Sequence, residues 1–222
     1  MDTGDVSGDE IRRQQGEKYA AMLASTNEDR ATSAAAVRLG DAMRAFTRAA
    51  VGSSAPDEVF ERIAGMVDQL TAELAPYAQP SRYEQADRLL PGTMFANHPM
   101  IGPANTNSPR IVMQPDGERL VGHVTFGTPQ EGPPNCAYGG YIAAGFDAIL
   151  LMTAGINGLG GPTKSMSIRY RKATPLNQPL QYVGEIASVD ERVTRVVGKL
   201  MSGDTVCAEA VGEAARTALR HA

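Results

Sequence analysis

The fold of this chain is decided by residues 131–140, EGPPNCAYGG, and by the mostly apolar stretch that follows over residues 141–154. A glycine-rich turn that leads into such a stretch predicts an apolar helix that begins near Gly139. The first N–H groups of a helix have no intrahelical partner and lie at the positive end of the helix dipole, so they can hold an oxyanion. The stretch carries one acid, Asp147, which can supply a base or a nucleophile. Together these features indicate a functional site.

Asp147 is surrounded in the sequence by Phe146, Ile149 and Leu150. An unpaired buried carboxylate is costly, so Asp147 is predicted to be a catalytic or ligand-contacting acid, or else to make a structural hydrogen bond or lie on a solvated helix face. Gly139 and Asp147 are eight residues apart, about 12 Å along a helix. One carbonyl group cannot easily touch both within a single chain. If both act on the same carbonyl, the site predicts a homodimer with two composite sites at its interface.

Strand-like runs lie on both sides of this helix. The first two, residues 110–114 and 119–127, are separated by Pro115-Asp116-Gly117, a turn signal that predicts a hairpin. The later runs are residues 163–172, 180–189, 192–201 and 205–213, with tight turns at 190–191 and 202–204. Because short turns join only antiparallel neighbours, we expect these four to form a meander. The sequence therefore predicts an α+β fold, with an antiparallel sheet around one helix.

The strand predicted over residues 163–172 alternates between two kinds of side chain. Met166, Ile168 and Tyr170 share one face, which we expect to pack on the helix. The opposite face carries the polar set Ser165, Ser167, Arg169 and Arg171.

The first half of the chain is predicted to be a helical extension. Residues 1–27 are polar and are expected to be flexible or only partly helical, and residues 28–90 form the extension, with helices at 28–50 and from Ser54 to Pro76. These helices are predicted to pack on the rest of the fold, and the alternative is a partner-binding surface. Residues 91–109, rich in Pro, Asn and Gly, predict a long loop that is either functional or a plain linker, before a domain over residues 110–222.

Composition excludes several classes of function. The formal charge is −4 and no basic block occurs, which argues against a nucleic-acid surface. Residues 1–10 have no apolar leader region and no stretch of roughly 18 uncharged apolar residues is present, so we expect a cytoplasmic protein without a membrane span. Two cysteines and three histidines form no metal-ligand pattern, and no metal or other cofactor is expected. Cys136 is either a small buried residue or a reactive thiol.

The order of these elements, and the segment from Glu131 through Tyr138-Gly139-Gly140 to Asp147, resemble those of hotdog-fold acyl-CoA thioesterases. The most similar type is the phenylacetate-pathway and 4-hydroxybenzoyl-CoA thioesterase-like group. The resemblance covers roughly residues 97–213, and residues 167–176, SIRYRKATPL, resemble the strand and Pro-containing turn that follow the helix in that family. It implies a hotdog fold, with the helical extension added at the N-terminus. It also implies an enzyme that hydrolyses an acyl-CoA to a free acid and coenzyme A.

Carried over residue by residue, the resemblance implies that the Gly139 N–H, beside Gly140, polarises the thioester oxygen. Asp147 would activate water or attack the carbonyl directly. In some relatives a hydroxyl at the start of the next strand helps to place the water, which corresponds here to Ser165 or, less directly, Thr163. Each of these two residues can equally be an ordinary strand residue.

The family usually has His immediately before the glycine pair, and this chain has Tyr138. A phenol still forms hydrogen bonds to a carbonyl, but it is larger and is not charged by protonation, so substrate orientation or pocket shape should change. Tyr138 can equally be a pocket wall. Arg169, Arg171 and Lys172 are predicted either to bind the phosphates of coenzyme A or to be exposed strand charges. In similar proteins the loop before the first strand, here residues 97–109, helps to cover the acyl pocket.

The predicted protein is thus an acyl-CoA thioesterase that forms a homodimer or a dimer of dimers. The alternative is a non-catalytic acyl-CoA-binding or regulatory hotdog dimer, which Tyr138 and the helical extension favour. A hotdog enoyl-CoA hydratase is a weaker alternative, because that branch usually has an Asp and a His in one loop motif and this chain has no such pair.

Overall fold

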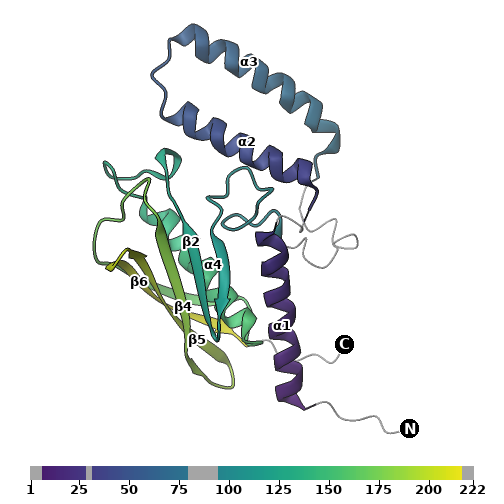
Figure 1. Ribbon diagram of the computed structural model, residues 1–222, viewed down its shortest axis with the longest axis vertical. Coiled ribbons are helices and arrows are strands. Elements are labelled where there is room, and N and C mark those ends of the chain that lie inside the picture. The colour runs from purple at the N-terminus through teal and green to yellow at the C-terminus, as the bar shows by residue number, and fades with distance from the viewer. Residues whose placement is uncertain (1–6, 29–31, 80–94, 217–222) are drawn as a thin grey trace.

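The computed structural model of the protein describes residues 7–28, 32–79 and 95–216. Its centre is a six-stranded antiparallel sheet that curves around the long helix α4 (Gly139–Ile156), with helices α1 to α3 outside it (Figure 1). The strand order is β1-β2-β4-β5-β6-β3. The strands are β1 (Val112–Asp116), β2 (Arg119–Val124), β3 (Thr163–Tyr170), β4 (Leu180–Val189), β5 (Val193–Ser202) and β6 (Thr205–Ala215). The α+β class and the sheet around one helix are therefore confirmed.

The position of β3 corrects the predicted four-strand meander. Only β4, β5 and β6 form a meander, because β3 lies at the far edge and pairs with β6. The chain between β3 and β4 crosses from one part of the sheet to another. It is held on the way by an isolated bridge between Cys136 and Pro175 and by a hydrogen bond of 2.7 Å from the Asn177 N–H to the Phe126 carbonyl. A loop of this length can return to a distant strand, whereas a two-residue turn cannot.

Helix α4 is the core of the fold. It is apolar on nearly all sides, and more than half of its residues are buried inside the structure, including Phe146, Ile149 and Met152. By length and composition alone it is the one helix of the described residues that could cross a membrane. Burial of this kind is what a helix wrapped by a sheet requires. The predicted apolar helix is confirmed.

Small residues bring the sheet close to α4. A Cβ atom on Gly184 of β4 would overlap Thr153 Oγ1, and one on Gly145 of the helix would overlap the hydroxyl of Tyr182. That hydroxyl donates a hydrogen bond of 3.1 Å to the Ile142 carbonyl, and the Tyr182 side chain is fully buried. The Thr153 and Tyr182 side chains thus each lie against a glycine, which leaves the space they need, as expected of a close-packed interior.

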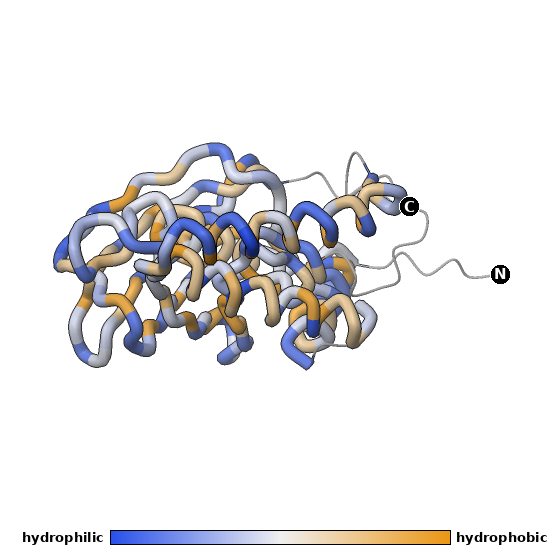
Figure 2. Tube along the Cα trace, turned by 90° about the horizontal axis from the view of Figure 1, so that it is seen from above, coloured by the Kyte–Doolittle hydropathy of each residue, from blue (hydrophilic) through white to orange (hydrophobic). Residues whose placement is uncertain are grey.

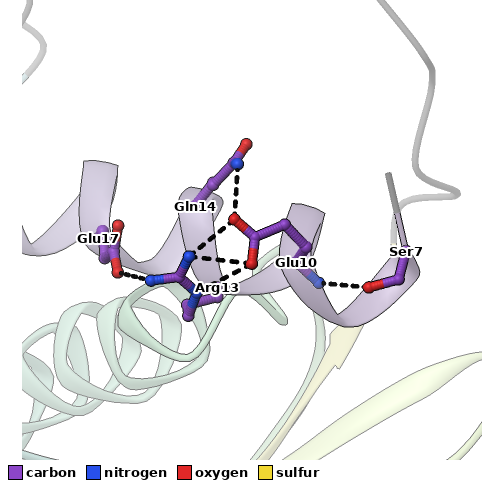
Figure 3. Close-up of polar contacts among 5 residues, drawn as sticks. All are labelled: Ser7, Glu10, Arg13, Gln14 and Glu17. Carbon is purple, nitrogen blue, oxygen red and sulfur yellow. Dashed lines mark hydrogen bonds and ion pairs between the residues drawn. The ribbon is translucent and has the colours of Figure 1, made fainter. Parts of the chain in front are cut away.

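Helix α1 (Gly8–Asn27) occupies most of the segment that was predicted to be flexible or only partly helical. Its start is fixed locally, because the Ser7 hydroxyl accepts a hydrogen bond from the Glu10 N–H (Figure 3). One turn further, Arg13 pairs with Glu10 at 2.7 Å and with Glu17 at 3.0 Å. These exposed pairs contribute little to stability, because solvent screens them. The helix therefore depends mainly on packing of its other face.

That other face of α1 packs on the end of the core helix. The Tyr19 ring lies where a Cβ on Gly155 would be 2.5 Å from its Cδ1 atom. The Arg12 guanidinium donates a hydrogen bond of 3.0 Å to the Asn157 carbonyl just beyond α4, and Met22 and Leu23 are buried in the core. Helix α1 is therefore part of the domain rather than a mobile leader.

The helical extension consists of α2 (Ala34–Val51) and α3 (Asp57–Leu74), followed by a short 3-10 turn, η1 (Ala75–Tyr77). Helix α2 begins later than predicted because the Ser33 hydroxyl caps it, accepting from the Ala36 N–H at 3.1 Å. Viewed from the side of α3, hydrophobic and hydrophilic residues alternate along the helical turns (Figure 2).

Helix α2 rests on the body through a narrow contact. Val37 and Gly40 are its buried residues, and a Cβ on Gly40 would overlap the Pro103 carbonyl. The Arg44 guanidinium donates to the carbonyls of Pro103 and Asn105 at 2.9 and 2.8 Å. The predicted packing of the extension on the fold therefore holds for α2.

The loop before β1 is ordered over its described residues, 95–109. Phe95, Met100 and Ile101 are buried, and the Phe95 ring lies 5.9 Å from that of Tyr19. The loop thus links α1 and α2 to the sheet. The part of the predicted extension and loop at residues 80–94 lies outside the described residues.

Candidate active site

The turn that precedes α4 is held on two sides. The Tyr138 N–H donates to the Gln130 carbonyl at 2.8 Å, and the Ala137 N–H donates to the Thr174 carbonyl at 2.9 Å. Within the turn, Asn135 adopts a left-handed φ of 60°, and its N–H donates to Glu131 Oε1 at 2.7 Å. These bonds fix where the helix starts, so the N–H groups of its first turn have a set direction.

The first two residues of α4, Gly139 and Gly140, have N–H groups without an acceptor in the part of the chain that the structure describes. The next two N–H groups, of Tyr141 and Ile142, both donate to the Tyr138 carbonyl, at 3.0 and 3.3 Å. Unpaired N–H groups at a helix start favour a negatively charged or strongly polarised oxygen. This is the property that an oxyanion-binding position needs.

A pocket of about 630 Å³ opens beside these two glycines. Its walls come from the turn, from the end of β3 and from the chain that follows β3. They include Cys136, Tyr138, Ile142, Tyr170, Lys172 and Thr174. A volume of this size suits a small organic group. The loop over residues 97–109, expected to cover the pocket, contributes none of the lining residues, and its Pro103 and Asn105 carbonyls contact α2 instead.

Tyr170 is a site residue that the sequence analysis did not single out. Its hydroxyl donates to the Gly139 carbonyl at 2.9 Å, and a Cβ on Gly139 would lie 3.3 Å from Tyr170 Cζ. The alternation of β3 predicted that Tyr170 faces the helix with Met166 and Ile168, and those two residues do pack against the core. The phenol thus ties the end of β3 to the start of α4.

Tyr138 lies at the mouth of the pocket and is 57% exposed. Its ring folds back over the glycines, since a Cβ on Gly140 would be 2.5 Å from Tyr138 Cε1 and one on Gly132 would be 3.2 Å from Tyr138 Cδ2. The phenol therefore stands beside the N–H groups of the first turn. A larger residue at position 140 would displace the ring, whereas one at position 132 would meet the Tyr138 backbone first, at its Cα atom.

Asp147 is exposed, although apolar residues surround it in the sequence. The helical period turns its side chain away from the buried face that carries Phe146 and Ile149. Asp147 Oδ1 accepts a hydrogen bond of 2.9 Å from Thr163 Oγ1, at the start of β3. Asp147 is therefore a solvated carboxylate with a hydrogen-bond partner, and its role as a catalytic or ligand-contacting acid stays a prediction.

Ser165, the preferred candidate for placing a water, does not contact Asp147 in this chain. Its hydroxyl donates to Glu213 Oε2 at 3.3 Å, on the outer face of the sheet. The β3–β6 register shifts between Thr163 and Ser165, so the bulge turns these two side chains to opposite faces. Thr163, the second candidate, is the hydroxyl that reaches the acid.

The predicted cationic residues border two hollows. Arg169 and Arg171 line one on the outer face of the sheet, and Arg171 and Lys172 line the pocket beside Gly139. Arg171 also pairs with Glu209, with Nε 2.8 Å from its carboxylate. Lys172 is thus the pocket cation without an ion-pair partner among the described residues.

Burial also affects two other titratable groups near the site. Burial raises the pKa of the Tyr182 phenol well above its usual range, and burial also raises the pKa of the Cys207 thiol. Among the described residues, no group of three His, Cys, Asp or Glu side chains is arranged to hold a metal ion.

Comparisons with known proteins point to one fold. No protein-family model and no curated protein matches this chain. Among solved structures, a thioesterase superfamily protein is 26% identical with a TM-score of 0.73, over 83% of this chain and 92% of its own. The PaaI protein of the Escherichia coli phenylacetic acid degradation operon is 12% identical (TM-score 0.44), over 46% of this chain and 75% of its own. A Streptococcus mutans protein bound to acetyl-CoA is 20% identical (TM-score 0.46), over 49% and 90%.

The match over most of both chains shows that this protein has the hotdog fold of thioesterase superfamily proteins. The match covers 83% of this chain, whereas the hotdog part alone spans about half of it. The match therefore includes part of the N-terminal helical extension. The predicted fold, a hotdog domain with an N-terminal helical extension, is confirmed.

Proposed function

We propose that this protein hydrolyses acyl-CoA thioesters. The observation that carries the proposal is the start of α4, where the unpaired N–H groups of Gly139 and Gly140 border a pocket. A thioester oxygen in this position would be polarised by those donors, which strengthen their interaction as negative charge develops. Similarity to a thioesterase superfamily structure over 83% of the chain supports this reaction class.

Asp147 is the proposed catalytic residue, and it would act through its carboxylate. As a general base its carboxylate would take a proton from water while the water oxygen attacks the thioester carbon. The C–S bond would then break, the sulfur would leave as a thiolate that gains a proton, and the acid would be released. As a nucleophile, Asp147 would attack the thioester carbon, the C–S bond would break with release of the thiolate, and water would hydrolyse the resulting mixed anhydride to the free acid and the Asp147 carboxylate. Thr163, at 2.9 Å, would orient the carboxylate in either route.

The proposed site needs two copies of the chain. Asp147 is not among the residues that line the pocket at Gly139, and the eight residues between them span about 12 Å of helix. In a twofold dimer with antiparallel α4 helices, the Asp147 of one chain would face the Gly139 of the other. We therefore propose a homodimer with two composite sites.

Coenzyme A would enter past the end of β3. Lys172 and Arg171 line the same pocket, so they supply positive charge for a phosphate, although Arg171 already pairs with Glu209. Tyr138 lies at the mouth, at the position where the family usually has His. A phenol is not charged by protonation as an imidazole is, which favours contact with the acyl group over proton transfer.

The test is free-thiol release from short, medium, long and aromatic acyl-CoAs by the wild-type protein and by Asp147→Asn. We expect the substitution to lower turnover by at least about 10²-fold in a folded dimer. The matched control is Asp204→Asn, an exposed acid in the β5–β6 turn, which should leave turnover unchanged.

Two outcomes would overturn the proposal. Equal turnover by wild-type protein and Asp147→Asn would remove the acid from the mechanism. Tight binding of acyl-CoA without thiol release by the wild-type protein would instead support the alternative, a non-catalytic acyl-CoA-binding dimer.

A further inference from the structure

The Gly139–Gly140 peptide at the start of α4 is held from outside the helix. The Tyr170 hydroxyl donates to the Gly139 carbonyl at 2.9 Å, across 31 positions of the chain. A carbonyl at this place in an α-helix accepts from the N–H four residues on, here that of Ala143, so the phenol uses its second lone pair. The phenol bond is therefore additional to the bonds that form the helix.

This bond acts on one of the two N–H groups that border the pocket. The Gly139 carbonyl and the Gly140 N–H belong to one planar peptide unit, so a partner that fixes the oxygen also fixes the direction of the N–H. The unit joins two glycines in the first turn of a helix, where backbone freedom is greatest and helices fray. Without the phenol, the Gly140 N–H would be less well oriented.

The other N–H group at the pocket is held in a different way. The Gly139 N–H shares its peptide unit with the Tyr138 carbonyl, which accepts from the N–H groups of Tyr141 and Ile142 at 3.0 and 3.3 Å. The helix itself therefore orients the first donor, whereas the second depends in part on Tyr170.

The phenol is carried on a firm support. Tyr170 is the last residue of β3 and lies opposite Ala208 of β6. The next two N–H groups, of Arg171 and Lys172, both donate to the Cys207 carbonyl, at 2.7 and 3.0 Å. The chain thus stays bound to β6 beyond the end of the strand, and the sheet determines where the hydroxyl lies.

We propose that Tyr170 is a positioning residue for thioester hydrolysis, an inference that rests on the proposed function. Its hydroxyl holds the Gly139–Gly140 peptide so that the Gly140 N–H donates to the thioester oxygen. Hydrogen bonds would then run from the phenol through the peptide to that oxygen, and bonds in such a chain polarise one another. The donor gains most in the transition state, where negative charge develops on the oxygen.

Tyr170→Phe tests this role, because it keeps the ring that lines the pocket and removes only the hydroxyl. Loss of a whole oxyanion donor costs about 10²–10³-fold in kcat, and here the donor stays but is less well oriented. We expect kcat for the best substrate of the acyl-CoA panel to fall by about tenfold, with KM unchanged within about twofold.

The matched control is Tyr182→Phe, which also removes a phenol that donates to a carbonyl of α4. Its acceptor is the Ile142 carbonyl, at 3.1 Å, and the N–H of that peptide unit lies inside the helix rather than at the pocket. We expect this control to leave kcat unchanged, although it removes a buried hydrogen bond. Circular dichroism checks that each variant is folded.

A second readout needs no turnover. Acetyl-CoA and benzoyl-CoA, each isotope-labelled at the thioester carbonyl, are bound to Asp147→Asn and to Asp147→Asn/Tyr170→Phe, and the carbonyl stretch is recorded by difference infrared spectroscopy. Hydrogen bonding weakens the C=O bond and lowers its frequency. We expect the frequency to return toward that of the free thioester when the phenol hydroxyl is absent, a change that a purely structural role of Tyr170 would not cause.

Equal kcat and equal carbonyl frequency with and without the Tyr170 hydroxyl would overturn the inference. A rise in KM alone, or a loss of kcat as large in Tyr182→Phe, would also overturn it. Failure of the proposed function is a different result, in which the wild-type protein binds the thioesters but releases no thiol. The infrared comparison is then made between the wild-type protein and Tyr170→Phe.

Discussion

Substitution of Gly184 by alanine is a direct test of how closely the sheet approaches α4. The added Cβ would overlap Thr153 Oγ1 and would lie 3.3 Å from Thr153 Cβ and 3.4 Å from Ile149 Cγ1. The Thr153 hydroxyl cannot easily turn away, because it donates a hydrogen bond of 2.6 Å to the Ile149 carbonyl and the side chain is fully buried. The new methyl group therefore has no free space.

The expected cost follows from two opposing effects. Overpacking of a dense core costs about 1–3 kcal/mol, and replacing glycine by alanine in a strand returns about 0.5–1 kcal/mol of chain entropy. We expect Gly184→Ala to lower the free energy of unfolding by about 1–2 kcal/mol. In a Thr153→Ala background the overlapping oxygen is gone, so the same substitution should be neutral or slightly stabilising.

The assay is urea unfolding followed by far-UV circular dichroism, at one protein concentration because an assembled protein gains stability with concentration. Thr153→Val is the matched control, since valine keeps the shape of threonine without the hydroxyl and the overlap remains. If Gly184→Ala costs the same within about 0.5 kcal/mol in wild-type and Thr153→Ala backgrounds, the two residues are not coupled and the packing argument is refuted.

Two further predictions concern single side chains. Thr163→Val should lower kcat/KM by about tenfold, because it removes a hydrogen bond to Asp147, whereas Ser165→Ala should leave kcat/KM unchanged; equal effects would contradict the assigned orientations. Asp190→Ala should lower the urea midpoint at pH 7, because backbone N–H bonds from Arg192 and Val193 lower the pKa of this carboxyl. A lowered folded-state pKa gives stability that is present above the unfolded value of about 4 and is lost as pH falls, so the two midpoints should converge in acid.

Local signals in the sequence were sufficient for most of the hotdog domain. Gly117 and Gly203 adopt left-handed φ values of 62° and 55° in the predicted hairpin turns, a conformation that glycine adopts without strain. The apolar stretch after Gly139 became the core helix. The alternation in β3 placed Met166 and Ile168 on the helix side, where they pack. In each case the signal acts within a few residues.

Features set by distant contacts could not be predicted in the same way. The place of β3 beside β6 depends on how the chain after Tyr170 crosses to β4, and no residue in that link specifies its destination. The length and docking of helix α1 could not be predicted because few of its side chains are apolar, and its burial depends on α4, more than a hundred residues away. Its cap, Ser7 followed by Glu10, was a signal that could have revealed its start.

The residues of the candidate site likewise divide into those that local sequence signals predict and those that depend on distant contacts. Gly139 and Asp147 were found because a helix start and a lone acid are visible in sequence. Thr163 rather than Ser165 reaches Asp147 because a bulge lies between them. The bulge inserts one residue and so reverses the alternation of side chains between the two faces of β3. Tyr170 was placed on the correct face, but its bond to the Gly139 carbonyl depends on the tertiary fold.

The docking of α1 on α4 has a consequence for synthesis of the protein. Arg12 and its partner Asn157 are separated by 145 positions, so α1 leaves the ribosome long before the helix it covers exists. At about 5–20 residues per second the delay is roughly 7–30 s. During this interval Met22 and Leu23, buried in the finished domain, are exposed on the nascent chain. Docking of α1 on α4 can therefore begin only after α4 has been synthesised.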